Sequence, residues 1–75
     1  MTHDLDATGL LCPLPVLRAR KRLRDLAVGD VLRVQTDDPA AIIDIPHFCA
    51  EQGHLLHDDG AQGSVHNWRI VKGTA

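Results

Sequence analysis

The first half of the chain alternates apolar stretches with turn residues in a strand–helix–strand pattern. His3 to Ala7 has the polar–apolar alternation of a short strand, and Thr8-Gly9 ends it. A helix is predicted to follow Cys12-Pro13 and to end near Gly29, since proline favours the first helical position and glycine the end. Val31 to Thr36 alternates and is rich in β-branched residues, which predicts a second strand.

The predicted first helix is amphipathic when its residues are placed about 100° apart on a wheel. Its apolar side consists of Val16, Ala19, Leu23, Leu26 and Ala27. Its polar side consists of Arg18, Lys21, Arg22 and Asp25. We therefore expect a surface helix whose apolar side packs on the rest of the molecule.

A second helix is predicted in two parts. Asp38 can cap a helical turn that begins with Pro39, but Pro46 would break a helix running straight on from there. Asp44 then caps a restart that places Pro46 in a first turn and runs to Gly53. The residues expected to face the core are Ile42, Ile45 and Cys49.

The last part of the chain reads as two strands. His54 to His57 predicts a third strand, Asp58 to Ser64 a Gly-rich turn or loop, and Val65 to Lys72 a fourth strand. The order is βαβαββ. A right-handed crossover joins the first two strands in parallel, and the final hairpin makes the sheet mixed. We predict a two-layer α/β sandwich with two helices on one face of a four-stranded sheet.

The composition limits what the chain can enclose. With 75 residues, 44% of them hydrophobic, it fits a single domain over residues 1–75. A domain of this size buries only about 60% of the surface that its unfolded chain exposes, so a deep pocket for a large cofactor would remove much of its core. We expect surface chemistry and no cofactor.

The ends and the metal-binding residue types give three further expectations. Met1 to Asp4 has neither the basic nor the apolar region of a signal peptide, which favours a cytoplasmic location. The two cysteines have neither CxxC nor metal-ligand spacing and are expected to be reduced thiols. No metal site is expected, and the histidines are interpreted as surface residues: His3, His47, His54, His57 and His66.

Cys12 is the candidate reactive residue because it precedes the first predicted helix. The positive end of a helix can lower a cysteine pKa to about 3.5–7.5 from about 8.5. Pro13 and Pro15 lack N–H groups, which leaves chiefly Leu14 and Val16 to meet a thiolate, but their fixed φ angles would hold the sulfur in one direction. From the residues alone, Cys12 could equally be a small buried apolar side chain.

Neither cysteine has a neighbour suited to redox cycling. The position three residues after Cys12, where a thioredoxin-type site has its resolving cysteine, is Pro15. A lone thiol of this kind suits a persulfide that is carried and handed on. Cys49 lies on the apolar side of the second predicted helix beside Phe48 and is interpreted as buried and inert.

Several short motifs have the order and spacing of a known family. They are Asp6-Ala7-Thr8-Gly9, Cys12-Pro13-Leu14-Pro15, Asp38-Pro39, Asp44-Ile45-Pro46 and Gly53-His54. With them the chain resembles the TusA, or SirA-like, sulfur carriers over nearly its whole length. The resemblance implies the same two-layer sandwich. It also implies that Cys12 takes up a persulfide sulfur from a cysteine desulfurase or rhodanese-type donor and relays it to an acceptor, as a sulfurtransferase-type carrier rather than a turnover enzyme.

The resemblance also suggests a destination and shows one departure. Asp44-Ile45-Pro46 and Phe48-Cys49 are most like the members that serve 2-thiolation of a tRNA wobble uridine. Carriers for sulfur oxidation, molybdenum-cofactor assembly or selenium metabolism are the alternatives. Relatives often have a carboxylate where this chain has Leu14, so no acid is expected to oppose the thiolate here.

Five of the eight basic residues fall in one segment: Arg18, Arg20, Lys21, Arg22 and Arg24. Arg18, Lys21 and Arg22 are candidates for docking acidic patches on the donor and the acceptor; the alternative is a merely solvated face. Direct nucleic-acid binding by this helix is not expected, since neither aromatic residue, Phe48 or Trp68, lies on it. A thiol redox sensor would need Cys49 to reach Cys12.

Overall fold

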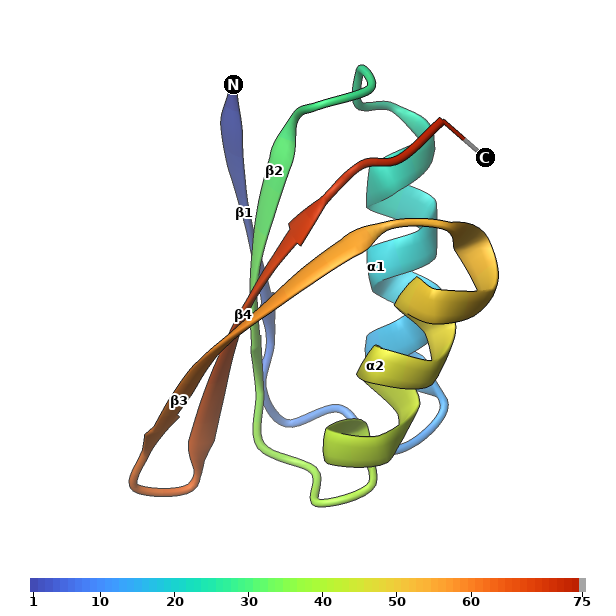
Figure 1. Ribbon diagram of the computed structural model, residues 1–75. Coiled ribbons are helices and arrows are strands. Elements are labelled where there is room, and N and C mark those ends of the chain that lie inside the picture. Colours follow the sequence, from blue (N-terminus) through green and yellow to red (C-terminus); the bar gives the residue numbers. More distant parts are fainter. Residues whose placement is uncertain (75) are drawn as a thin grey trace.

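The computed structural model describes residues 1–74 and has the βαβαββ order that the sequence predicts. The elements are β1 (Thr2–Ala7), α1 (Leu14–Arg24), β2 (Val31–Thr36), α2 (Ala41–Gln52), β3 (Leu55–Gln62) and β4 (Val65–Val71). The sheet order is β1-β2-β4-β3, with β1 and β2 parallel and the other two pairs antiparallel. Both helices lie on one side of the sheet (Figure 1), so the predicted two-layer sandwich is confirmed.

The core lies between the sheet and the helices. In β2, Leu32, Val34 and Thr36 are buried while Arg33 and Gln35 are exposed, because successive side chains of a strand point to opposite faces. The hydroxyl of Thr36 is satisfied there, since the indole N–H of Trp68 donates to its Oγ1 at 3.0 Å.

The helix α1 buries the predicted side but is shorter than expected. Ala19 and Leu23 are buried. The helix ends at Arg24 rather than near Gly29, because the N–H groups of the next two residues donate to carbonyls only three residues back. Ala27 therefore lies outside the helix and is exposed, which corrects its predicted place on the apolar side.

The prediction that α2 is interrupted before Pro46 is wrong. The helix runs unbroken from Ala41 to Gln52, with Pro46 inside it and no side chain capping its start. The proline removes one hydrogen bond, to the carbonyl of Ile42, and that residue is exposed, so water can reach it. Ile45 and Cys49 face the core as expected, whereas Ile42 does not. The helix ends at Gly53, whose φ of 73° is left-handed.

The hairpin β3–β4 is longer than the sequence suggests. Residues 58–62, predicted as loop, continue β3 and pair with β4 across a bulge between Asp58 and Gly60. Cross-strand contacts support this extension: Asp59 forms an ion pair with Arg69 at 2.7 Å, and Asp58 is hydrogen-bonded to His66 at 2.6 Å. The acidic and glycine residues of this segment are typical of a loop, and for that reason the sequence predicted one. The turn between the two strands is much shorter than the predicted loop.

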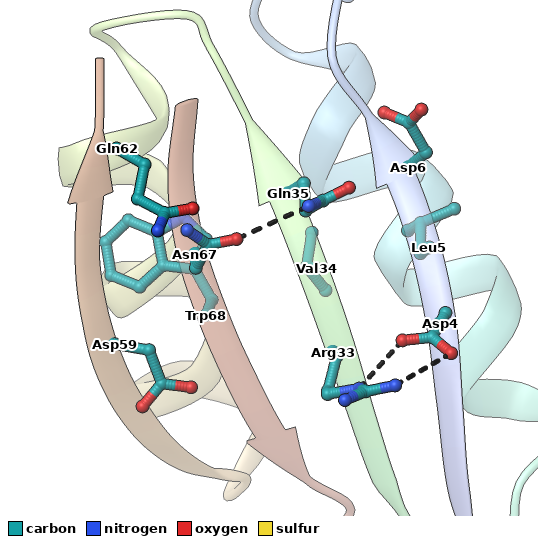
Figure 2. A pocket seen from close by; sticks show the side chains of 10 residues that line it. All are labelled: Asp4, Leu5, Asp6, Arg33, Val34, Gln35, Asp59, Gln62, Asn67 and Trp68. Carbon is teal, nitrogen blue, oxygen red and sulfur yellow. Dashed lines mark hydrogen bonds and ion pairs between the residues drawn. The ribbon is translucent and has the colours of Figure 1, made fainter. Parts of the chain in front are cut away.

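The face of the sheet away from the helices is polar and hollowed. Figure 2 shows Asp4 bonded to Arg33 and Gln35 close to Asn67 across neighbouring strands, around a hollow of about 560 Å³. Its lining contains no cysteine or histidine. Among residues 1–74, no helix is long and apolar enough to cross a membrane.

Candidate functional site

Cys12 lies at the junction between β1 and α1. It is exposed, and Pro13 stands at the start of the helix after a cis Cys12–Pro13 peptide bond. The alternative interpretation of Cys12 as a buried apolar residue is therefore wrong. The segment between β1 and α1 lies at the same end of the molecule as the start of α2 (Figure 1), and the exposed thiol of Cys12 can be reached from solvent.

Two carboxylates at the start of α2 hold Cys12: Asp38 precedes the helix and Asp44 lies in its first turn. The backbone N–H of Cys12 donates to Oδ2 of Asp38 at 2.5 Å, and its thiol donates to Oδ2 of Asp44 at 2.8 Å. Asp38 also accepts the backbone N–H of Ala40 through its other oxygen, at 3.1 Å. The two aspartates thus tie the start of α1 to the start of α2.

These contacts raise the pKa of the Cys12 thiol, whereas the sequence predicted that the helix start would lower it. The hydrogen bond to Asp44 is the largest of the effects that raise the pKa of Cys12, and loss of hydration and the charges of Asp44 and Asp38 act in the same direction. The helix end offers little to oppose them. The N–H of Leu14 already donates to the carbonyl of Leu11 at 2.8 Å.

The predicted lowering of the Cys12 pKa is accordingly wrong, and so is the expectation that no acid opposes the thiolate. The carboxylate comes from α2 instead of from the residue between the two prolines. A protonated thiol, hydrogen-bonded to Asp44, is the form that this arrangement favours at neutral pH.

A hollow of about 300 Å³ opens beside Cys12 between α1 and α2. Its apolar wall includes Leu17 and Phe48. Its charged groups include Arg20, while His47 and Glu51, which also line it, pair with each other at 2.5 Å. The hollow is large enough to admit a few side chains of a partner next to the sulfur, and its mixed lining offers both apolar contact and a cation.

The three residues of α1 predicted to dock partners differ in their exposure. Arg18 and Lys21 are exposed on α1, but neither lines the hollow. Arg22 is partly buried, and its charge acts on Asp4 of β1. The cation of α1 that does line the hollow is Arg20.

Cys49 has the environment expected of a structural residue. Its side chain is 1% exposed, and burial raises the pKa of its thiol to about 11. Its predicted burial on the core side of α2 is confirmed. Among residues 1–74, no three histidine, cysteine or acidic side chains gather closely enough to hold a metal ion.

The comparisons with known proteins point to one family. A family model described as Sulfurtransferase TusA matches residues 3–72. The chain belongs to the TusA family. A SirA-like protein of Desulfitobacterium hafniense has a crystal structure that matches with a TM-score of 0.84 at 30% identity, covering 97% of this chain and 99% of that one. Membership of the TusA family makes the chain a sulfur carrier of the sulfurtransferase type, with a sulfur donor and a sulfur acceptor as partners.

In this TusA-family chain, sequence reasoning missed the two residues that contact Cys12. Asp38 and Asp44 were interpreted as helix caps, although both belong to motifs on which the family resemblance rests. Their position in two separate motifs was the available signal. It could not show that both carboxylates meet the cysteine, because the thiol and Asp44 are 32 residues apart in the chain.

Proposed function

We propose that Cys12 carries sulfane sulfur as a persulfide, which it accepts from a cysteine desulfurase or rhodanese-type donor and passes to a downstream relay protein. The observation that carries this proposal is the contrast between the two free thiols. Cys12 is exposed beside a hollow, whereas Cys49 is buried. A single accessible thiol can hold a sulfur atom without a neighbouring thiol displacing it.

The two prolines of the box are proposed to position the sulfur. Pro13 is exposed next to Cys12, and Pro15 is buried in the first turn of α1. Each fixes its own φ angle, so the chain on the C-terminal side of the cysteine has little freedom. Together with the Asp38 contact to the Cys12 backbone, this restraint keeps the sulfur at one place on the surface.

The partners are proposed to dock on α1. Arg18, Lys21 and Arg22 form a basic surface on the helix that begins just after Cys12, and acidic patches on a donor or acceptor would complement it. Arg20 in the hollow adds a cation closer to the sulfur. Steering by these charges suits a carrier that must meet two partners in turn.

The destination that we propose is 2-thiolation of a tRNA wobble uridine in the cytoplasm. It rests on Asp44-Ile45-Pro46 and Phe48-Cys49, which resemble the members that serve this pathway. Adding the loaded protein to a reconstituted tRNA-thiolation relay should yield 2-thiouridine. A loaded carrier that supplies no sulfur to this relay would favour sulfur oxidation, molybdenum-cofactor or selenium metabolism instead.

The experiment that tests carriage is mass spectrometry of the protein after incubation with a cysteine desulfurase and cysteine. The wild type should gain one sulfur atom on the peptide that contains Cys12. Cys12→Ser should gain none, and Cys49→Ser should gain as much as the wild type. A disulfide between the two cysteines, in place of an added sulfur, would contradict carriage and favour a redox sensor.

A further inference from the structure

The contact between Cys12 and Asp44 links the starts of α1 and α2, yet the thiol that makes it is exposed. It joins the atom proposed to carry sulfur to a carboxylate at 2.8 Å, within the range in which a general base takes a proton. The carboxylate lies in the first turn of α2, and the positive end of a helix stabilises a negative charge there. The carboxylate of Asp44 is therefore a charged base in direct contact with the sulfur of Cys12.

We propose that Asp44 is a catalytic residue of the sulfur carrier: it takes the thiol proton of Cys12 during sulfur uptake and returns it to the leaving sulfur of the donor. The inference rests on the proposed function, because it concerns the persulfide chemistry of Cys12. It gives Asp44 a role beyond its place in the first turn of α2.

With this proton transfer included, the atoms and electrons of the sulfur exchange balance. As the thiol proton moves to Oδ2 of Asp44, Sγ of Cys12 attacks the outer sulfur of the donor hydropersulfide and forms the new S–S bond. The donor S–S bond breaks, and its electron pair leaves on the donor sulfur as a thiolate. Asp44 then protonates this thiolate. One S–S bond forms and one breaks, so no oxidant or reductant is needed.

A base is needed here because the same carboxylate makes the free thiolate scarce. The hydrogen bond to Asp44 and its charge raise the pKa of Cys12, so the empty carrier holds an unreactive thiol. Asp38 adds a second negative charge. The other charged groups around the sulfur are Arg20, His47 and Glu51, which line the hollow.

In the loaded state Sγ itself can no longer donate this hydrogen bond. Once Sγ carries the second sulfur it has no proton to donate, and its lone pairs face the carboxylate of Asp44. Once the outer sulfur has lost its proton to water, the carboxylate that holds the empty thiol would repel the persulfide anion, which favours rotation of the anion into solvent or into the hollow beside it. Asp44 thereby distinguishes the empty from the loaded carrier.

The test compares sulfur uptake by the wild type and by Asp44→Asn across neutral pH, with glutathione persulfide as the donor. The amide keeps the shape and an acceptor oxygen but cannot take the proton. The variant should be slower by about 100-fold near pH 7, the lower end of the range for general-base catalysis. Its rate should then rise about tenfold per pH unit with the thiolate fraction, while the wild-type rate changes little.

Three variants control for other causes. Asp25→Asn removes the same charge at the other end of α1 and should behave as the wild type. His47→Gln removes the imidazole that lines the same hollow as Cys12 and should leave the flat profile in place. Asp44→Glu should restore part of the rate and the flat profile. If circular dichroism shows that the asparagine variant is unfolded, Asp44→Ser replaces it.

The outcomes separate this inference from the proposed function. Equal rates and equal pH profiles for the wild type and Asp44→Asn would overturn the catalytic role while sulfur carriage stands. Faster uptake by Asp44→Asn at every pH would also overturn it, since Asp44 would then only suppress the thiolate. Failure of the wild type to take up sulfur from any donor would overturn carriage itself.

Discussion

The two cysteines show how neighbours decide the chemistry of one side-chain type. Both thiols have a raised pKa, but for Cys12 the main cause is a carboxylate contact and for Cys49 it is burial. A carboxylate can also accept the proton that it holds, whereas an apolar core cannot. An accessible thiol with a base beside it can therefore lose its proton as it reacts with a partner, and a buried thiol without a base stays inert.

The buried thiol makes a prediction about alkaline stability. Between its ordinary pKa of about 8.5 and about 11, Cys49 is protonated in the native protein but ionised in the unfolded chain. Unfolding then releases a proton, so the free energy of unfolding falls as pH rises. Urea unfolding should show a loss on the order of 1 kcal/mol between about pH 8 and pH 10.

The control for this prediction is Cys49→Ala. It should be less stable than the wild type at pH 8, because it leaves a small cavity, but it should lack this part of the alkaline loss. Cys12 titrates in both proteins, and the chain has no tyrosine, so the difference between the two curves isolates Cys49. Parallel curves would show that the thiol is not shielded from water.

The sequence singled out Cys12 as the candidate residue but did not show the protonation state of its thiol. The position before Pro13 singled out Cys12 from local signals alone. Its hydrogen bond to Asp44 depends on the packing of two helix starts, which no local pattern contains. The expectation of a lowered pKa considered only the helix that follows Cys12 and omitted the helix that begins beside it.

Among the elements, some bounds were predictable from the sequence and others were not. The strand Val31–Thr36 matches its predicted bounds, because alternation and β-branching agree there. The end of α1, the unbroken course of α2 and the length of β3 were missed. The length of β3 depends on cross-strand contacts, such as the ion pair between Asp59 and Arg69, that outweigh local turn residues.

The end of the last strand makes a prediction at the scale of elements. The chain after β4 runs against the turn that follows α2, where the backbone N–H of Gly73 donates to Nδ1 of His54 at 2.9 Å. A Cβ on Gly73 would lie 1.8 Å from the carbonyl oxygen of Gly53. Gly73→Ala should therefore separate the two segments and destabilise the fold by about 1 kcal/mol.

Urea unfolding measures this loss, with Thr74→Ala at the neighbouring exposed position as the control. The NMR signals of the His54 ring should also move in Gly73→Ala, because the ring loses its hydrogen-bond donor. An unchanged free energy of unfolding together with unchanged His54 signals would show that the terminal segment does not pack on the turn.

For the whole molecule, the topology followed from a few general rules. A parallel strand pair joined by a helix and a closing hairpin leave few arrangements for βαβαββ, and the mixed sheet with both helices on one face is among them. The rules do not say which loops meet. In this fold the starts of α1 and α2 lie at one end of the molecule, and that arrangement brings the aspartates to Cys12 (Figure 1).

The charge distribution of the molecule predicts how partners reach this end. Arg18 and Lys21 project from α1 into solvent, whereas the basic groups of the sheet face, Arg33 and Arg69, are neutralised by aspartates. Unpaired charges act at longer range than paired ones, so α1 should dominate the attraction of an acidic partner. Replacing Arg18 and Lys21 by glutamine should slow sulfur transfer from a desulfurase by about tenfold at low salt, through association.

The matched control places the same change in net charge on the opposite face. Gln35→Glu with Gln62→Glu also lowers the net charge by two, on exposed residues that line the hollow of the sheet. Stopped-flow transfer rates should be near those of the wild type for this control, and added salt should slow the wild type towards the α1 variant because it screens exposed charges. Uptake from glutathione persulfide should be the same in all three proteins, since the reacting groups are untouched. Equal slowing by both charge changes would assign the effect to net charge alone and leave the basic side of α1 as a solvated face.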